Sequence, residues 1–291
     1  MPLKIGIMAS QAGWHVRALQ EALQRRGAEA PFFPITRFCA WVYGRVHLEA
    51  GSDAIESCQA LLVRTIPIGS LEQIIFRMDA LHRLERLGTK VINSPTAIER
   101  TVDKYYTSFL LQDAGIPTPR TAVTENFEQA LTAFRELKDV VLKPLFGSEG
   151  KGMLRLSDED LAYRTFRALE LGRYVYYIQE FIPHGQDDFR AFVIGDRVVA
   201  AMRRKGSTWK SNVAQGAQVE PVTLPPEMEE LSMRASRLVG TDYAGIDLLQ
   251  ADDGRIYVLE VNSIPGWRGL QQTTTQNIAE LIVDHILKGL E

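Results

Sequence analysis

Apolar residues in the first third of the chain follow two periods in turn. Short continuous apolar runs predict buried strands, and stretches with an apolar residue at every third or fourth position predict amphipathic helices. The strands are expected over 4–9, 60–63 and 91–92, and the helices over 14–26 and 70–87. Such alternation is typical of an open parallel α/β sheet. We therefore predict an N-terminal α/β domain over residues 1–95.

The pattern changes near residue 95, where Ser94 and Pro95 have the residue types that start a helix. Helical periodicity then continues to Ala114. We expect a central subdomain over 96–183, with strands over 120–124, 140–144, 153–156 and 175–182 and helices over 126–137 and 158–171. A C-terminal subdomain over 184–291 would follow, with two hairpins and helices over 226–239 and 276–287.

The second of these hairpins places two carboxylates opposite each other. If residues 253 and 254, Asp-Gly, form a two-residue turn, Asp252 faces Arg255 and Asp247 faces Glu260. Directly opposed residues have Cβ atoms about 5 Å apart. Asn262 lies on the same face, because side chains alternate along a strand. The other face is expected in the core and carries Ile246, Leu248, Leu259 and Val261.

Facing carboxylates destabilise a sheet unless a positive charge lies between them. Mg²⁺ or Mn²⁺ would supply that charge, because carboxylate and amide oxygens are hard ligands. The alternative is a solvent-exposed polar face, on which an arginine or lysine partners one carboxylate. The pairing depends on register, since a shift by one residue would separate Asp247 from Glu260.

A glycine-rich segment over 146–152 lies between two predicted strands. Its glycines either let backbone N–H groups approach an anion or form a flexible hairpin turn. It is not a Walker A loop, because Gly152 follows Lys151 where Ser or Thr is required. Lys143, among apolar neighbours, either reaches solvent or pairs with an anion. With Lys104 and the carboxylates, these are the parts needed to hold a nucleoside triphosphate and its metal.

Composition narrows the possible partners. The chain has 291 residues, with 33 Lys and Arg against 36 Asp and Glu, and its formal net charge is −3. A protein that coats nucleic acid is visibly basic, so we expect no nucleic-acid partner. No apolar run approaches the roughly 20 residues that cross a bilayer, so we expect no membrane partner. Cys39 and Cys58 lack metal-ligand spacing and indicate reduced thiols in the cytoplasm.

Taken in order, these segments resemble ATP-grasp enzymes, and among them the RimK-type α-L-glutamate ligases. The resemblance covers residues from about 90 to 290. It rests on Asp103-Lys104, Lys143-Pro144, the glycines at 147, 150 and 152, Gln179-Glu180-Phe181-Ile182, Asp188, Arg190, Lys210-Ser211-Asn212, Asp247, Glu260 and Asn262. It implies an ATP-grasp fold, with an N-terminal open parallel α/β lobe, a central lid subdomain and a C-terminal lobe on an antiparallel sheet.

The resemblance also implies roles for individual residues. The ATP site would consist of Lys104, Lys143, Gly147, Ser148, Gly150, Lys151, Gly152, Glu180, Phe181, Asp188, Lys210, Ser211 and Asn212. Arg190 and Arg204 would be catalytic and face the acyl phosphate or a substrate carboxylate. Asp247, Glu260 and Asn262 would bind Mg²⁺ or Mn²⁺, with two ions expected. ATP would phosphorylate a carboxylate to an acyl phosphate, and an amine would attack it to form an amide.

The segment after the metal motif bears on the substrate. Trp267 and Arg268 either contact it, by stacking on a flat ring and pairing with a carboxylate, or Trp267 only packs the loop. The run from Trp267 to Gln271 resembles cofactor-glutamylating ligases of the tetrahydromethanopterin type. We therefore expect L-glutamate to be added to a pterin- or deazaflavin-type cofactor or to a protein C-terminus, by a homo-oligomer.

Two other functions are open from the sequence. One is a ligase that acts on an amino-acid carrier protein, whose acidic tail would fit the basic stretch Arg203, Arg204, Lys205 and Lys210. The other is a nucleotide-binding subunit without ligase activity. The intact lysines and carboxylates argue against that second alternative, since a decaying site tends to lose its metal ligands.

Overall fold

The N-terminal lobe is built on a parallel four-stranded sheet in the order β2-β1-β6-β7, as predicted. Its strands are β1 (Ile5–Ala9), β2 (Phe32–Pro34), β6 (Ala60–Val63) and β7 (Lys90–Ile92). Helix α1 (Trp14–Arg25) covers one face and α2 (Leu71–Arg86) the other, because alternate strand residues belong to two separate cores. The computed structural model describes residues 2–50, 53–147, 151–206, 209 and 218–290.

Helix ends in this lobe lie where the sequence predicts them. Ser70 accepts a hydrogen bond from the backbone N–H of Gln73 and completes a capping box at the start of α2. Gly27 and Gly88 follow α1 and α2 and have φ angles of 72° and 95°, a region that favours glycine. Local residue types are therefore enough to set these boundaries.

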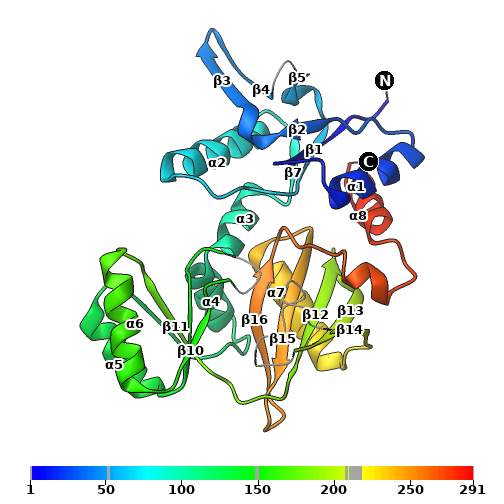
Figure 1. The fold of residues 1–291 in the computed structure, drawn as a ribbon. Helices are drawn as coiled ribbons and strands as arrows, with labels where there is room; N and C mark the ends of the chain where they lie inside the picture. Colours follow the sequence, from blue (N-terminus) through cyan, green and yellow to red (C-terminus); the bar gives the residue numbers. More distant parts are fainter. Residues whose placement is uncertain (1, 51–52, 148–150, 207–208, 210–217, 291) are drawn as a thin grey trace.

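The sequence does not predict an antiparallel hairpin that projects from the N-terminal lobe (Figure 1). Strand β3 (Phe38–Tyr43) pairs with β4 (Arg45–Ala50), which also pairs with β5 (Asp53–Ala54). The end of β3 is apolar yet exposed, with Val42 at 78% and Tyr43 at 71%. A strand whose outer residues are apolar lacks the polar alternation that identifies a half-buried strand.

The predicted single helix up to Ala114 is wrong, because it is two helices, α3 (Pro95–Val102) and α4 (Lys104–Asp113). Asp103 leaves the helical conformation at the junction. Its carboxylate accepts hydrogen bonds from the backbone N–H groups of Tyr105 and Tyr106, at 2.9 and 3.1 Å. Asp103 thus caps α4 and makes Lys104 its first residue.

The central lobe has an antiparallel sheet in the order β10-β9-β11-β8. Its strands are β8 (Thr121–Thr124), β9 (Val140–Lys143), β10 (Leu154–Leu156) and β11 (Tyr176–Glu180). Helices α5 (Phe127–Leu137) and α6 (Glu159–Leu171) pack on the face that carries Val140, Leu142 and Ile178. The opposite face carries Lys143, Tyr177 and Gln179, and α4 contacts it where Ser108 Oγ lies 2.6 Å from Tyr177 Oη.

The C-terminal lobe has an antiparallel sheet in the order β14-β13-β12-β15-β16, with α7 (Pro226–Val239) against it. Its strands are β12 (Asp187–Ile194), β13 (Arg197–Lys205), β14 (Gln218–Pro221), β15 (Tyr243–Gln250) and β16 (Ile256–Asn262). Ile194 pairs with Arg197 across the predicted turn between β12 and β13. No helix among the described residues is long and apolar enough to cross a membrane.

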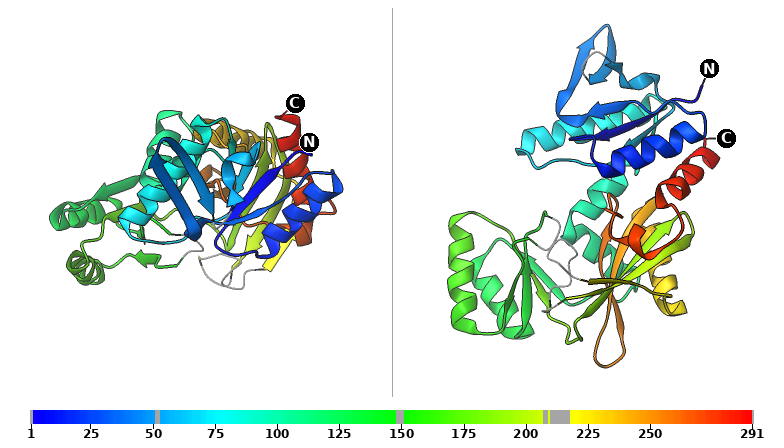
Figure 2. Two further views of the ribbon diagram at one scale, coloured as in Figure 1. Left: turned by 90° about the horizontal axis from the view of Figure 1, so that it is seen from above. Right: turned by 45° about the vertical axis from the view of Figure 1, so that its right-hand side comes forward.

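The end of the chain returns to the N-terminal lobe. Helix α8 (Ile278–Lys288) lies beside α1 (Figure 2), and Leu19 and Ile282 share one core with Tyr243 and Trp267 of the C-terminal lobe. The strands of the three larger sheets lie within 5–92, 121–180 and 187–262, and α8 completes the N-terminal core. The two lobes are therefore joined by shared packing as well as by the chain.

Asn93, which directly follows β7, joins the N-terminal lobe to the C-terminal lobe by hydrogen bonds. Its side chain is fully buried, and its amide nitrogen donates to the carbonyl oxygens of Tyr243 and Ser263 at 2.8 and 2.6 Å. Its amide oxygen accepts from the backbone N–H groups of Asp242 and Tyr243 at 2.6 and 3.3 Å. Four backbone groups, three of them in buried hydrogen bonds, thus depend on one side chain.

We expect Asn93→Ala to lower the free energy of unfolding by about 3 kcal/mol, because it leaves these buried groups without partners. Chemical denaturation would measure the change. Asn126→Ala, which removes the N-cap hydrogen bond of α5 on a single lobe, is the control and should cost about 1 kcal/mol. A loss at Asn93 no larger than that of the control would contradict the role assigned to it.

Candidate active site

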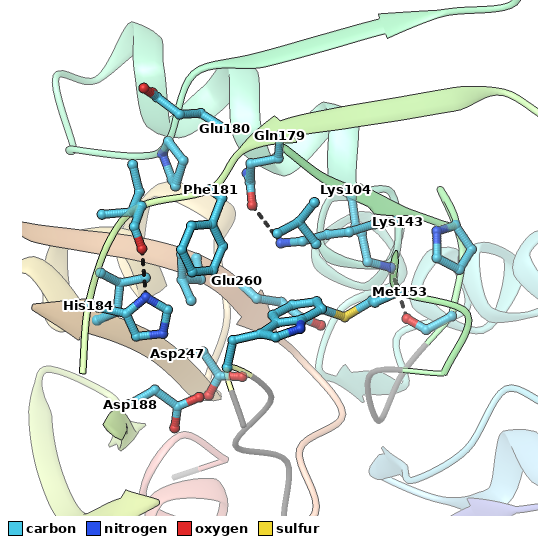
Figure 3. Close-up of a pocket in the computed structure, with 18 of the residues that line it drawn as sticks. Lys104, Lys143, Met153, Gln179, Glu180, Phe181, His184, Asp188, Asp247 and Glu260 are labelled. Atoms are coloured by element: carbon cyan, nitrogen blue, oxygen red, sulfur yellow. Dashed lines mark hydrogen bonds between the residues drawn. The ribbon is translucent and has the colours of Figure 1, made fainter. Parts of the chain in front are cut away.

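A pocket lies between the central and C-terminal lobes, and most of the predicted site residues that the structure describes line it (Figure 3). Strands β9 and β11 form one wall and β15 and β16 another. The predicted residues that line it are Lys104, Lys143, Gly147, Lys151, Glu180, Phe181, Asp188, Arg204, Asp247 and Glu260. Predicted residues Ser148, Gly150, Lys210, Ser211 and Asn212 lie outside the described residues, and Gly152 lies in the turn before β10.

The predicted pairing of Asp247 with Glu260 across β15 and β16 is confirmed. The expected two-residue turn is wrong, because Ala251 donates its N–H to the carbonyl of Arg255 at 2.8 Å and the turn is one residue longer. A bulge after Asp247 leaves Leu259 unpaired and cancels this shift. Leu259 consequently lines the pocket instead of the core. The remaining apolar residues of that face are in the core as predicted: Ile246, Leu248 and Val261.

Two arginines neutralise the carboxylate of Asp247, which is 7% exposed. Arg190 holds both oxygens through its Nε and Nη2, each at 2.6 Å, and Arg204 Nη2 lies 3.2 Å from Oδ1. Arg204 also forms a two-pronged ion pair with Asp188. Burial raises the pKa of Asp247, but the two arginines outweigh it and hold the pKa below its ordinary value.

Glu260 and Asn262 offer oxygen atoms that suit a hard metal ion, whereas both oxygens of Asp247 are held by arginines, as the alternative of an arginine partner for one carboxylate expects. Glu260 has no hydrogen bond or ion pair to any described residue, so its oxygens are available. Asn262 ends β16, and its Oδ1 accepts from the backbone N–H of Ile264 at 2.9 Å. The described residues hold no cluster of three His, Cys, Asp or Glu side chains, so an amide is the third oxygen donor on this face. This donor set suits Mg²⁺.

Two lysines enter the pocket from the other wall (Figure 3). Lys104 Nζ donates to the carbonyl oxygens of Leu145 and Gly147 at 3.3 and 2.9 Å, and Lys143 Nζ donates to Gln179 Oε1 at 2.5 Å. Burial lowers the pKa of Lys143 to about 8, an effect that Glu260 opposes and Lys104 reinforces. Burial also lowers the pKa of Lys104. Neither ammonium forms an ion pair with a described carboxylate, which leaves this wall positively charged.

The sequence does not predict an apolar part of the pocket. Its lining includes Met153, Trp209, Leu249 and Leu259. These residues carry no chemical motif, so only the pocket itself identifies them. Phe181 was expected there, and it lies between this lining and Arg155, whose guanidinium sits 3.5 Å from the ring centroid. The Glu180 carboxylate points away from the lysines (Figure 3).

Trp267 does not face the pocket. Its side chain is fully buried, and its ring lies 4.5 Å from both the His15 ring and the Arg64 guanidinium. The backbone N–H of Trp267 donates to His15 Nε2 at 3.1 Å. This position matches the loop-packing interpretation and leaves no ring face for a substrate to stack on. Burial, Arg64 and Arg268 lower the pKa of His15 to about 4, which keeps its ring neutral. Arg268 is exposed.

Comparison with known proteins decides the family. A model of the RimK-like ATP-grasp domain matches residues 101–286. The chain belongs to the RimK-like ATP-grasp family. A tetrahydromethanopterin:alpha-L-glutamate ligase of Methanococcus maripaludis is 32% identical over 98% of each chain. An alpha-aminoadipate–LysW ligase of Sulfurisphaera tokodaii is 32% identical over 75% of this chain and 81% of its own.

A solved structure agrees with these relatives. The ATP-grasp ligase PsnB, in complex with minimal precursor, Mg and ADP, is similar with a TM-score of 0.75 and 25% identity over 98% of both chains. The ATP-grasp fold expected from the sequence is therefore confirmed, and the protein is an ATP-grasp ligase. Ligases of this fold bind ATP with Mg²⁺.

The low pKa of Lys143 gives nucleotide binding a pH dependence. A phosphate beside Lys143 would raise its pKa towards the ordinary value of about 10.4, so binding takes up a proton above the pKa of the free protein. We expect MgADP affinity to be constant below about pH 8 and to fall above it. Isothermal titration calorimetry between about pH 7 and about pH 9.5 measures this.

Lys143→Arg is the matched control, because a guanidinium keeps its proton throughout this range. Its affinity should be less dependent on pH than that of the wild type. An equal fall of affinity in both proteins would assign the pH dependence to another group.

Proposed function

We propose that this chain joins L-glutamate to a carboxylate acceptor through an acyl phosphate. The observation that carries the proposal is the pocket itself, in which Asp247 and Glu260 on one wall face Lys104 and Lys143 on the other. The charges of these walls complement a metal-bound nucleotide, whose phosphates need cations and whose metal needs carboxylates. The relatives named for α-L-glutamate ligation support the choice of amino acid.

The proposed reaction has two steps. An oxygen of the acceptor carboxylate attacks the γ-phosphorus of ATP, the bond between this phosphorus and the bridging oxygen breaks, and ADP leaves. The glutamate amine then attacks the acyl carbon, the bond to the phosphate oxygen breaks, and phosphate leaves as the nitrogen loses a proton. Lys104 and Lys143 hold the phosphates, and the apolar lining takes the adenine. Asp188 was expected in the ATP site, and in this proposal its role is to orient Arg204 through their ion pair.

Asp247, Glu260 and Asn262 would hold Mg²⁺ or Mn²⁺, with two ions expected. Bound there, the metal neutralises charge on the transferring phosphoryl group. Arg190 and Arg204, beside Asp247, would stabilise the oxyanion of the tetrahedral intermediate with forked N–H groups. Ion pairs with Asp247 and Asp188 hold both guanidinium groups beside the Asp247 carboxylate, and Arg204 itself lines the pocket.

For the acceptor we favour a small cofactor of pterin or deazaflavin type over a carrier-protein tail. A relative aligned over 98% of both chains is named for tetrahydromethanopterin, and one aligned over 75% of this chain is named for the LysW carrier. The described part of the basic stretch, residues 203–205, has little unpaired charge to offer an acidic tail, and Lys210 lies outside the described residues. Arg203 pairs with Asp187, Arg204 with Asp188 and Lys205 with Glu220. Arg268, exposed beside the buried Trp267, is proposed to meet an acceptor carboxylate.

The remaining expectations are part of the proposal. We place the enzyme in the cytoplasm, which agrees with the free thiols of Cys39 and Cys58. We also propose a homo-oligomer, because Trp41, Val42 and Tyr43 expose apolar surface on a projecting hairpin. A nucleotide-binding subunit without ligase activity has less support. A site that has lost its activity tends to lose its metal ligands, whereas this chain keeps the carboxylates of Asp247 and Glu260.

We expect the purified protein to release ADP over many turnovers only when Mg²⁺, L-glutamate and a pterin- or deazaflavin-type acceptor are present together, because without glutamate the acyl phosphate of the first step is not consumed. The acceptor should gain the mass of one or more glutamyl residues, which mass spectrometry detects. Release of ADP with a carrier protein instead would select the carrier alternative. Tight MgATP binding without product from any acceptor would favour the non-catalytic subunit.

We expect Glu260→Gln to lower turnover by about 100-fold or more, because an amide cannot neutralise the metal as a carboxylate does. Steady-state ADP release at saturating ATP measures this, and circular dichroism should show an unchanged fold. Glu230→Gln, at an exposed position on α7, is the matched control and should keep full activity. Normal turnover of Glu260→Gln would contradict the assignment of the metal site.

A further inference from the structure

A buried polar network lies within the lysine wall of the pocket, and Gln179, its central residue, is one of the residues that line the pocket. Gln179 on β11 is 2% exposed, and its amide makes three hydrogen bonds. Its Oε1 accepts from Lys143 Nζ at 2.5 Å, and its Nε2 donates to Thr121 Oγ1 at 3.1 Å and to Tyr177 Oη at 3.2 Å. Tyr177 Oη in turn lies 2.6 Å from Ser108 Oγ.

The partners fix the orientation of the Gln179 amide. An ammonium group only donates hydrogen bonds, so the amide oxygen must face Lys143. The amide nitrogen then faces Thr121 and Tyr177, whose hydroxyl oxygens accept. Turning the amide over would place two donors against each other in a buried site and would leave Lys143 without its acceptor. Lys143 is thereby held in one direction.

The same network reaches the second lysine. Ser108 and Lys104 are four residues apart on α4, so they lie on the same face of that helix. Tyr177 lies directly opposite Lys143 between β11 and β9. The contact between Ser108 and Tyr177 therefore sets the helix that carries Lys104 against the sheet that carries Lys143. One network determines the spacing of both ammonium groups.

The chemistry of an amide suits this task better than that of a carboxylate. A glutamate in place of Gln179 would form a buried ion pair with Lys143 and cancel its charge. The neutral amide orients the ammonium and leaves its full charge for an anion in the pocket. Resting on the proposed function, we infer that Gln179 is a positioning residue, which aims Lys143 at the phosphates of ATP.

The test is a double-mutant cycle read by calorimetric binding of MgATP, so it needs neither acceptor nor turnover. Gln179→Met keeps the length of the side chain but removes the acceptor, and we expect it to weaken binding about 10-fold. Lys143→Met should weaken binding at least as much. The double variant should bind no more weakly than Lys143→Met alone, because Gln179 acts through Lys143.

Two further variants separate positioning from plain stability. Gln179→Glu keeps an acceptor oxygen next to Lys143 but cancels its charge, so binding should weaken although the fold is retained. Thr121→Val removes a partner of Gln179 that does not touch Lys143, so it should lower the melting temperature with MgATP affinity within about 2-fold of the wild type.

The inference would be overturned by wild-type MgATP affinity in Gln179→Met or Gln179→Glu, or by additive losses in the double variant. Equal losses of affinity in Thr121→Val and Gln179→Met would also overturn it, since they would mark a purely structural network. Because binding alone is measured, the proposed function fails separately, by normal MgATP binding without any ligated product.

Discussion

The structure of the cleft depends on the compensation of buried charge. Asp247 is taken out of water between two strands, and such a carboxylate is tolerated only when it is paired and hydrogen-bonded. Arg190 and Arg204 pair with Asp247. The buried guanidinium of Arg204 needs a second negative charge, which Asp188 supplies. The order β13-β12-β15-β16 brings these residues into neighbouring positions on one face. The charges of these buried residues are therefore balanced only when the strands are in this order.

The other charges of the cleft are left for a ligand. Glu260 has no partner among the described residues, and Lys104 and Lys143 have only uncharged acceptors. Groups of both signs therefore face one pocket without meeting each other. Their separation costs stability in the free protein, and in the proposed function a nucleotide with its metal would return that stability on binding. This is how the geometry connects to the ligase chemistry of the family.

Short-range rules predicted much of the chain. Helix α7 and strand β15 have the bounds that periodicity gives, and Ser70 and Ser94 cap the helices expected of them. The pair of Asp247 and Glu260 was predictable because a hairpin joins neighbours in sequence. Errors arose where one residue changes the local geometry. Asp103 interrupts a helix whose periodicity continues across it, and a bulge at Leu259 offsets a longer turn.

The sequence by itself determined most of the elements, the carboxylate pair and, through ordered motifs, the family. The tertiary structure decided which buried polar groups meet. It placed Trp267 in the junction of the lobes instead of the pocket, α8 against α1, and Gln179 behind Lys143. The reason is physical: periodicity and capping act over a few residues, whereas a buried charge takes its partner from whichever strand or helix packs beside it.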